Sequence, residues 1–298
     1  MDWRPDRRLR RRMALALALT LLGYAALLAP VVWLLPWQGW LVAGGVLVGI
    51  LGLLTLEADL IAYWLTDAVA IERGQYPQLF DTVDRLAAQA DLPRPPIAVV
   101  PTDEPNALSA GTGDRTAVLV TLGLLKTLDD DQLAAVLAHE IAHLKNGDSS
   151  ALTVAGFPTA VAAALVGGGL DNVDLKAVVL GYVFVPLYLA LLGLPLLLVS
   201  LPGTLALARY REYAADRGAV AITGDPVALA TALGELYLQE SPPETDLRRI
   251  AGLAPFCVLP TAATPLPVPS MHPPTHRRIR RLRKLAAELE GVDPGADG

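Results

Sequence analysis

The sequence predicts a mainly α-helical membrane protein, with four hydrophobic segments in two hairpins and an α+β domain that holds a small sheet outside the bilayer. The first observation behind this is three uncharged runs, residues 13–56, 149–170 and 177–208, which are 44, 22 and 32 residues long. A bilayer crossing needs about 20 apolar residues, so each run is long enough. The second observation is that the polar sequence between and after these runs mixes helix and strand patterns.

Charge is distributed unevenly along the chain, whose formal net charge is −6. Residues 1–12 hold six arginines, and residues 277–284 hold five arginines and one lysine. Beside a membrane domain, such basic clusters are expected to face anionic lipid, so no nucleic-acid partner is predicted. The single cysteine, Cys257, excludes an intrachain disulfide and is interpreted as a small apolar filler.

The first elements are a basic tail, residues 1–12, and a transmembrane hairpin, residues 13–56. We expect its crossings at 13–35 and 39–56, joined by a tight turn rich in tryptophan, which favours membrane interfaces. The arginines before the first crossing place the N-terminus in the cytoplasm, and the second crossing returns the chain there.

Residues 57–148 are expected to form the first part of a cytoplasmic catalytic domain. Helical periodicity, short apolar runs and a glycine-rich turn identify its elements, and acidic residues favour the start of its last helix. The predicted elements are a helix at 78–90, a buried strand at 97–100, a hairpin of strands at 106–110 and 116–121, and a helix at 129–146.

That last helix contains the motif H-E-x-x-H, formed by His139, Glu140 and His143. Residues four apart lie on one helix face, so both imidazoles can reach one metal ion. Glu140 lies about 100° around the helix from His139, where it can hold a water without coordinating the metal. A solvated polar face is the alternative interpretation, but the apolar flanks of the motif argue against it. The motif therefore predicts a zinc hydrolase.

A second hydrophobic hairpin, residues 149–201, is expected to cross the membrane twice or to insert in part. Both versions leave the C-terminal part, residues 202–298, on the same side as the H-E-x-x-H helix. Its predicted elements are a helix at 204–220, a helix that begins at Pro226 with Asp225 as its N-cap, a proline-rich loop at 254–274, and a helix at 275–289. In the last helix we expect Ile279, Leu282, Ala286 and Leu289 to face inward and the arginines to face outward.

A zinc hydrolase needs a third protein ligand, and no histidine lies between His143 and His272. Glu212 and Asp216 are four residues apart on a predicted helix, so one face presents both carboxylates. Glu212 can ligate the metal while Asp216 accepts the outer N–H of a ligand histidine. Surface ion pairs of these acids with neighbouring arginines are the alternative, and spacing alone leaves both open.

Several stretches of the chain resemble the HtpX-type membrane zinc peptidases, which are related to the CAAX prenyl proteases. The H-E-x-x-H motif is followed by Lys145-Asn146-Gly147-Asp148, as in that family. The other matching stretches are Arg211–Asp216, Pro105–Ala107, Val118–Leu125 and His272–Thr275. One departure is His276, where the family commonly has an acidic residue.

This resemblance, which covers nearly the whole chain, implies a zincin-like catalytic domain that binds one zinc ion. It implies Glu212 as the third ligand and Glu140 as the base that activates water at the zinc. It also implies that Asn106 and the strand at 118–121 hold the substrate backbone, and that His272 stabilises the oxyanion.

We therefore expect an endopeptidase of the cell membrane, with its zinc site and both termini in the cytoplasm. The resemblance implies polypeptide substrates, among them misfolded or surplus membrane proteins. A CAAX prenyl-type protease is one alternative, but its chamber uses more crossings than four hydrophobic segments allow. A non-catalytic scaffold or a transporter is the other, but the intact Glu140 and the absence of charge within the spans argue against both.

Overall fold

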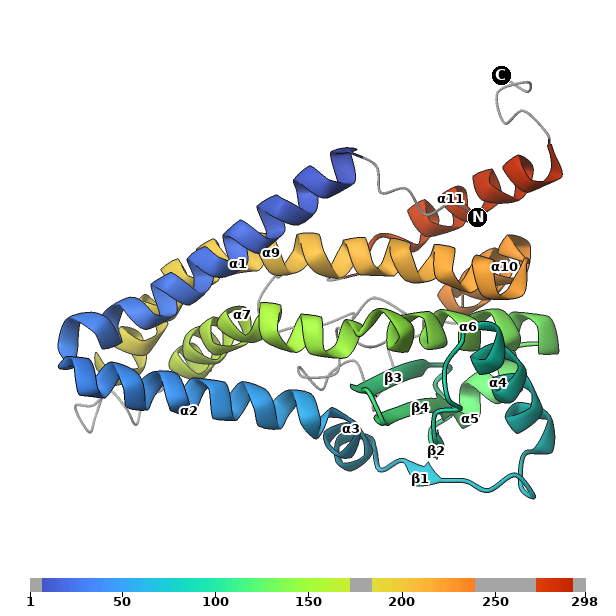
Figure 1. Cartoon of the computed structure of the whole chain (residues 1–298), viewed down its shortest axis with the longest axis horizontal. Coiled ribbons are helices and arrows are strands. Elements are labelled where there is room, and N and C mark those ends of the chain that lie inside the picture. The colour runs from blue at the N-terminus through green and yellow to red at the C-terminus, as the bar shows by residue number, and fades with distance from the viewer. Residues whose placement is uncertain (1–6, 172–183, 239–271, 292–298) are drawn as a thin grey trace.

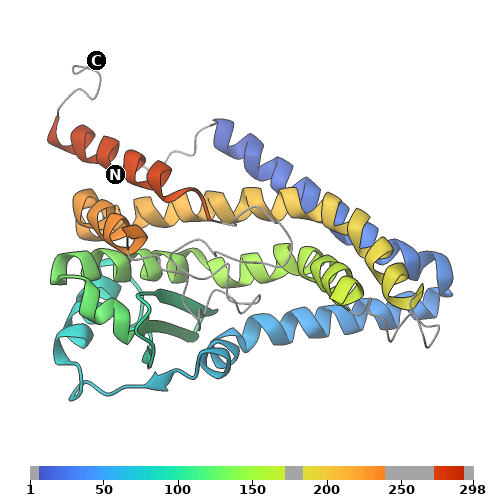
Figure 2. The same ribbon diagram turned by 180° about the vertical axis from the view of Figure 1, so that it is seen from behind.

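The computed structural model describes residues 7–171, 184–238 and 272–291 (Figure 1). Long helices run along its longest axis: α1 (Arg7–Leu34), α2 (Trp37–Leu56), α7 (Asp148–Asp171) and α9 (Phe184–Thr223). The α1–α2 turn lies at one end of this axis in both views, and a small sheet with its covering helices lies at the other (Figure 2). The structure is thus mostly helical with a small sheet, as the sequence predicts.

In the part of the chain that the structure describes, three helices are long and apolar enough to cross a membrane, namely α2, residues 148–167 of α7, and α9. The apolar part of α1, Ala18–Leu34, is shorter, so a crossing by α1 stays a prediction. α2 has no buried residue, and Trp33, Trp37 and Trp40 are exposed at the α1–α2 turn, as expected for side chains that face lipid and its interface.

The second hairpin differs from the prediction, because a single helix of 40 residues, α9, replaces a membrane segment ending at 201 and a separate helix at 204–220. Pro202 stands inside this helix without ending it. Neighbouring helices pack closely here: a Cβ added to Gly203 would lie 2.9 Å from Leu19 of α1. On α7, Thr159 Oγ1 lies 2.8 Å from Thr204 Oγ1. Such packing and side-chain hydrogen bonds stabilise proline-containing helices in membranes. The helix-ending residues proline and glycine, read from the sequence alone, do not show this stabilisation.

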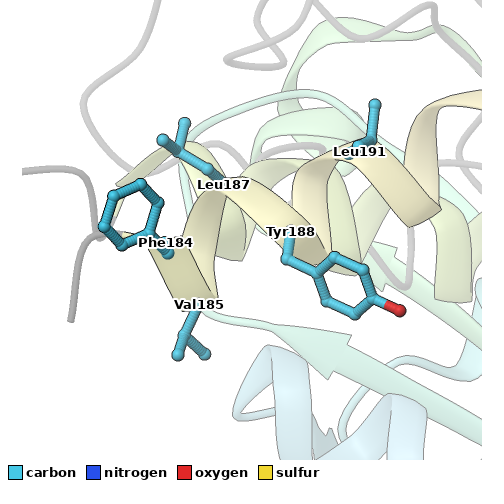
Figure 3. Close-up of a pocket in the computed structure, with 5 residues that line it drawn as sticks. All are labelled: Phe184, Val185, Leu187, Tyr188 and Leu191. Atoms are coloured by element: carbon cyan, nitrogen blue, oxygen red, sulfur yellow. The ribbon is translucent and has the colours of Figure 1, made fainter.

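A hollow near the start of α9 is lined by apolar side chains of that one helix (Figure 3). It shares no residue with the H-E-x-x-H motif. Its lining residues are Phe184, Val185, Leu187, Tyr188 and Leu191. Since they all lie on a candidate membrane span and are exposed, we interpret the hollow as part of the lipid-facing surface.

Within the described residues, the sheet has four strands in the order β1-β2-β4-β3. Their bounds are Val69–Ala70 for β1, Ile97–Val100 for β2, Ala107–Thr112 for β3 and Arg115–Thr121 for β4. β3 and β4 form the predicted antiparallel hairpin, β4 pairs in parallel with β2, and the short β1 was not predicted. β4 is therefore an inner strand with a partner on each side, and β3 is an edge strand of the described sheet.

Helices cover both faces of the sheet, which explains why most residues of β2, β3 and β4 are buried, whereas the short β1 is exposed. On one face, α3 (Ala58–Thr66) packs against alternate residues such as Ala98 and Leu108. On the other face, residues such as Val99 and Val118 join the main core with α4 (Pro77–Gln89), α6 (Asp130–Asn146) and α10 (Pro226–Leu238). Between β4 and α6, α5 (Leu122–Thr127) begins with Thr121 as its N-cap.

α10 begins as predicted, because the Asp225 carboxylate accepts hydrogen bonds from the N–H groups of Val227 and Ala228. The last helix, α11 (Thr275–Glu290), buries Leu282 and Ala286 as expected. Two expectations for this helix are wrong. Leu289 was expected to face inward but is exposed, and Arg278 was expected to face outward but is buried. Most of the predicted loop at 254–274 lies outside the described residues.

Candidate metal centre

α6 presents the two histidines of the motif on one buried face. A capping box formed by Asp129 and Gln132 starts the helix, and Gly147 ends it with a left-handed φ of 65°. The Nε2 atoms of His139 and His143 lie 3.1 Å apart, with ring centroids 4.6 Å apart and nearly perpendicular. Both imidazoles therefore direct Nε2 at one point, as the sequence predicts.

Glu212 on α9 completes the group. Its carboxylate oxygens lie 3.7 Å from His139 Nε2 and 3.7 Å from His143 Nε2, and ligand atoms of the three residues all lie within 4.8 Å of one another. α9 reaches α6 at Gly218, where an added Cβ would stand only 2.7 Å from Ala142. The small residue lets the two backbones approach, and this crossing brings the third candidate ligand to the histidines.

Each histidine is oriented from behind by a carboxylate. His139 Nδ1 lies 3.2 Å from Asp216 Oδ1, the contact predicted for Asp216. His143 Nδ1 lies 2.5 Å from Asp148 Oδ2, a contact that was not predicted. Such partners fix the tautomer and turn Nε2 toward a metal. Asp148 directly follows Gly147, which ends α6. Its position close to the motif was the sequence signal that could have identified it as the partner of His143.

Two buried arginines stand behind these carboxylates. Arg211 Nε lies 2.8 Å from Asp148 Oδ1. Arg278 Nη2 lies 2.6 Å from Asp216 Oδ1, and its Nη1 lies 2.9 Å from Glu212 Oε2. Burial lowers the pKa of Arg278, but Asp216 and Glu212 outweigh it and raise that pKa above its ordinary value. Arg278 was missed because arginines were expected to face outward, although it falls four residues before the buried Leu282.

The charges of this buried cluster fit a divalent cation. Among the described residues, its buried acids are Glu140, Asp148, Glu212 and Asp216, and its buried arginines are Arg211 and Arg278. With Asp148, Glu212 and Asp216 ionised and the histidines neutral, one negative charge remains, and ionised Glu140 makes it two, which one divalent ion neutralises. Buried charges are stable only when paired or bound to a metal, so this donor set fits a metal ion.

Glu140 lies beside the centre without belonging to the ligand group. It is fully buried, and burial raises the pKa of its carboxyl group to about 7, against the opposing effects of His143 and of a hydrogen bond with Ser109 of β3. Its Oε2 atom has no hydrogen-bond partner among the described residues. A buried carboxyl group with an unused oxygen and this pKa can accept and return a proton near neutral pH.

The remaining predicted residues fall in different places. His272 is buried at the centre, with Nδ1 3.1 Å from Glu212 Oε1. Asn106 lies at the start of β3, where its Oδ1 accepts a hydrogen bond from the Ala107 N–H. The expectation that the strand at 118–121 holds the substrate is wrong, since β2 and β3 already occupy both of its edges.

Comparison with known proteins gives a consistent result. The description "Peptidase family M48" belongs to a family model that matches residues 74–286, which includes α6, Glu212 and most of α11. The chain is 36% identical to "Protease HtpX homolog 2" of Methanosarcina mazei, over 78% of this chain and 80% of that one.

Two further relatives are similar over more of their length. "Protease HtpX homolog" of Moorella thermoacetica is 36% identical over 85% of this chain and 88% of its own. "Protease HtpX homolog 1" of Streptomyces coelicolor is 36% identical over 98% of each chain, so the likeness includes the hydrophobic helices.

Proposed function

The chain belongs to peptidase family M48 and is a membrane metalloprotease of the HtpX type, and we propose that it is a zinc endopeptidase that cleaves membrane proteins at the cytoplasmic face. The observation that carries this proposal is the convergence of His139, His143 and Glu212 on one point. Two imidazoles and one carboxylate are a donor set typical of catalytic zinc.

Zinc held by these three residues acidifies water and polarises a carbonyl group when it is bound. Around it, Glu140 accepts the proton of the attacking water and delivers it to the leaving amine. Asp148 and Asp216 keep the two imidazoles in the tautomer that ligates. His272 lies at the centre, with Nδ1 3.1 Å from Glu212 Oε1, and its ring donates a hydrogen bond to the oxyanion.

We propose that the substrate lies along β3 rather than β4. β3 is an edge strand of the described sheet, unlike β4, and its Ser109 interacts with the side chain of Glu140. An extended peptide can add to such an edge through main-chain hydrogen bonds. Asn106, at the start of β3, then orients one end of the peptide.

The proposed topology follows from charge and helix order. The arginines at 7–12 keep the start of α1 in the cytoplasm, and crossings by α1 and α2 return the chain there before the sheet. α7 and α9 then leave and return, so that Glu212 meets α6 on the same side. Attachment of the site to these helices favours membrane proteins with misfolded or surplus segments as substrates.

A chelation experiment on the purified protein tests the proposed activity. In detergent, an unfolded polypeptide should be cleaved at internal bonds, cleavage should stop after metal removal, and added zinc should restore it. Glu140→Gln should be inactive with and without zinc, which excludes a contaminating protease. Activity that persists in the metal-free protein would contradict the proposal.

A further inference from the structure

Arg278 differs from the other basic residues of α11. It is 1% exposed, whereas the remaining basic residues of the helix lie at its surface. Those exposed residues are Arg277, Arg280, Arg281, Arg283 and Lys284. A buried arginine costs much desolvation free energy, so its position calls for specific partners.

Its partners include the two acids that the metal centre takes from α9, and its Nη2 also lies 3.3 Å from Nε2 of His139. Nε and Nη2 of Arg278 contact the two oxygens of Asp216, at 3.0 and 2.6 Å, in a fork that matches the carboxylate. Nη1 lies 2.9 Å from Glu212 Oε2. One guanidinium group thus holds both the candidate ligand and the carboxylate that orients His139.

We propose that Arg278 is a positioning residue of the metal centre, through which the docking of α11 fixes Glu212 and Asp216 in the geometry that binds the ion. This proposal rests on the proposed metal site. Arg278 is a cation and cannot ligate a metal itself. It acts through the two carboxylates, and its contacts leave Glu212 Oε1 near His143, at 3.7 Å from Nε2.

The planar fork, and not the charge alone, is what the geometry requires. Lysine carries one compact ammonium group and cannot contact both oxygens of Asp216 and also Glu212 in the same plane. Arg278→Lys should therefore keep the buried charge but lose the geometry. Arg278→Gln removes the charge as well and leaves both carboxylates without their shared partner.

Metal retention during chelator competition measures the effect directly. We expect the apparent metal affinity to fall by about 10- to 100-fold in Arg278→Lys, and by at least as much in Arg278→Gln. Lys284→Ala is the matched control, since Lys284 is an exposed basic residue of α11 whose ion pair is with Glu288 of the same helix. This variant should bind metal like the wild type.

Thermal unfolding of the metal-free proteins separates positioning from a general loss of fold. Arg278→Lys should unfold cooperatively and still bind metal weakly. If Arg278→Gln does not fold, Arg278→Lys decides alone, and a folded Arg278→Lys protein with wild-type metal affinity would overturn the proposal. If the wild type itself binds no metal, the proposed function fails instead.

Discussion

At the scale of residues, the metal centre repeats one arrangement twice. Each ligand histidine contacts a carboxylate through Nδ1, and each carboxylate contacts a buried arginine. His139 uses Asp216 with Arg278, and His143 uses Asp148 with Arg211. Both imidazoles are therefore fixed before a metal arrives, which lowers the entropy lost on binding.

The contact between Asp148 and His143 gives the first prediction. Asp148→Asn should lower metal affinity by about 10- to 100-fold, because the neutral amide no longer holds the imidazole as firmly. Chelator competition measures this. Asp225→Asn is the control, since asparagine also caps helices well and Asp225 caps α10 away from the site. Equal metal retention in Asp148→Asn and the wild type would show that His143 does not need this partner.

His272 gives the second prediction. His272→Phe should lower the turnover number by about 100-fold if the ring donates to the oxyanion. The zinc content should stay at the wild-type level, because the three ligands remain. Since His272 Nδ1 also lies near Glu212, a fall in zinc content with unchanged turnover per bound zinc would give His272 a supporting role instead.

The sequence sufficed for the residues of the site that are set by local geometry. His139, Glu140 and His143 follow from helical spacing, and Glu212 follows from the family resemblance. Asp148 was missed although it lies only 5 residues from His143, and Arg278 was missed because its contact with Asp216 spans 62 residues. Arg278 shows the limit of prediction from local sequence. The rule that arginines face solvent fails here, because Arg278 pairs with buried carboxylates.

At the scale of elements, the crossing of α6 and α9 determines the ligand distances. Gly218→Leu is the third prediction: its side chain would collide with Ala142, separate the helices and move Glu212 from the histidines. Both the apparent melting temperature and metal affinity should fall. The control Gly234→Ala, in α10, meets only Ile279 at 4.0 Å and should be neutral or slightly stabilising. A Gly218→Leu protein with normal metal binding would show that the crossing tolerates separation.

The presence of each helix and strand was easier to predict from the sequence than where it ends and which elements it packs or pairs with. The hairpin, the amphipathic α4 and the capped α6 follow from local patterns and turn chemistry. The continuity of α9 was missed because its first part is apolar and its last part is polar. This change of composition was interpreted as the boundary between two helices. The inner position of β4 depends on pairing with β2, which no local pattern specifies.

At the scale of the whole molecule, membrane topology is the fourth prediction. In a Cys257→Ser background, Asp114→Cys in the exposed β3–β4 turn should be labelled only from the cytoplasm. Gln38→Cys, in the first turn of α2, should be labelled from outside. An impermeant maleimide on intact cells and on inverted vesicles distinguishes the two. External labelling at position 114 would place the metal centre on the wrong side of the membrane.

The central claim is that one glutamate acts as the base and the other binds the metal, and zinc stoichiometry after mild chelation tests it most directly. Glu140→Gln leaves three ligands, so the purified variant should hold about one zinc per chain and be inactive. Glu212→Gln leaves two histidines and a weak neutral donor, so it should lose its zinc under the same conditions. Retention of zinc by Glu212→Gln at the wild-type level would contradict the account, because the third ligand would then lie elsewhere.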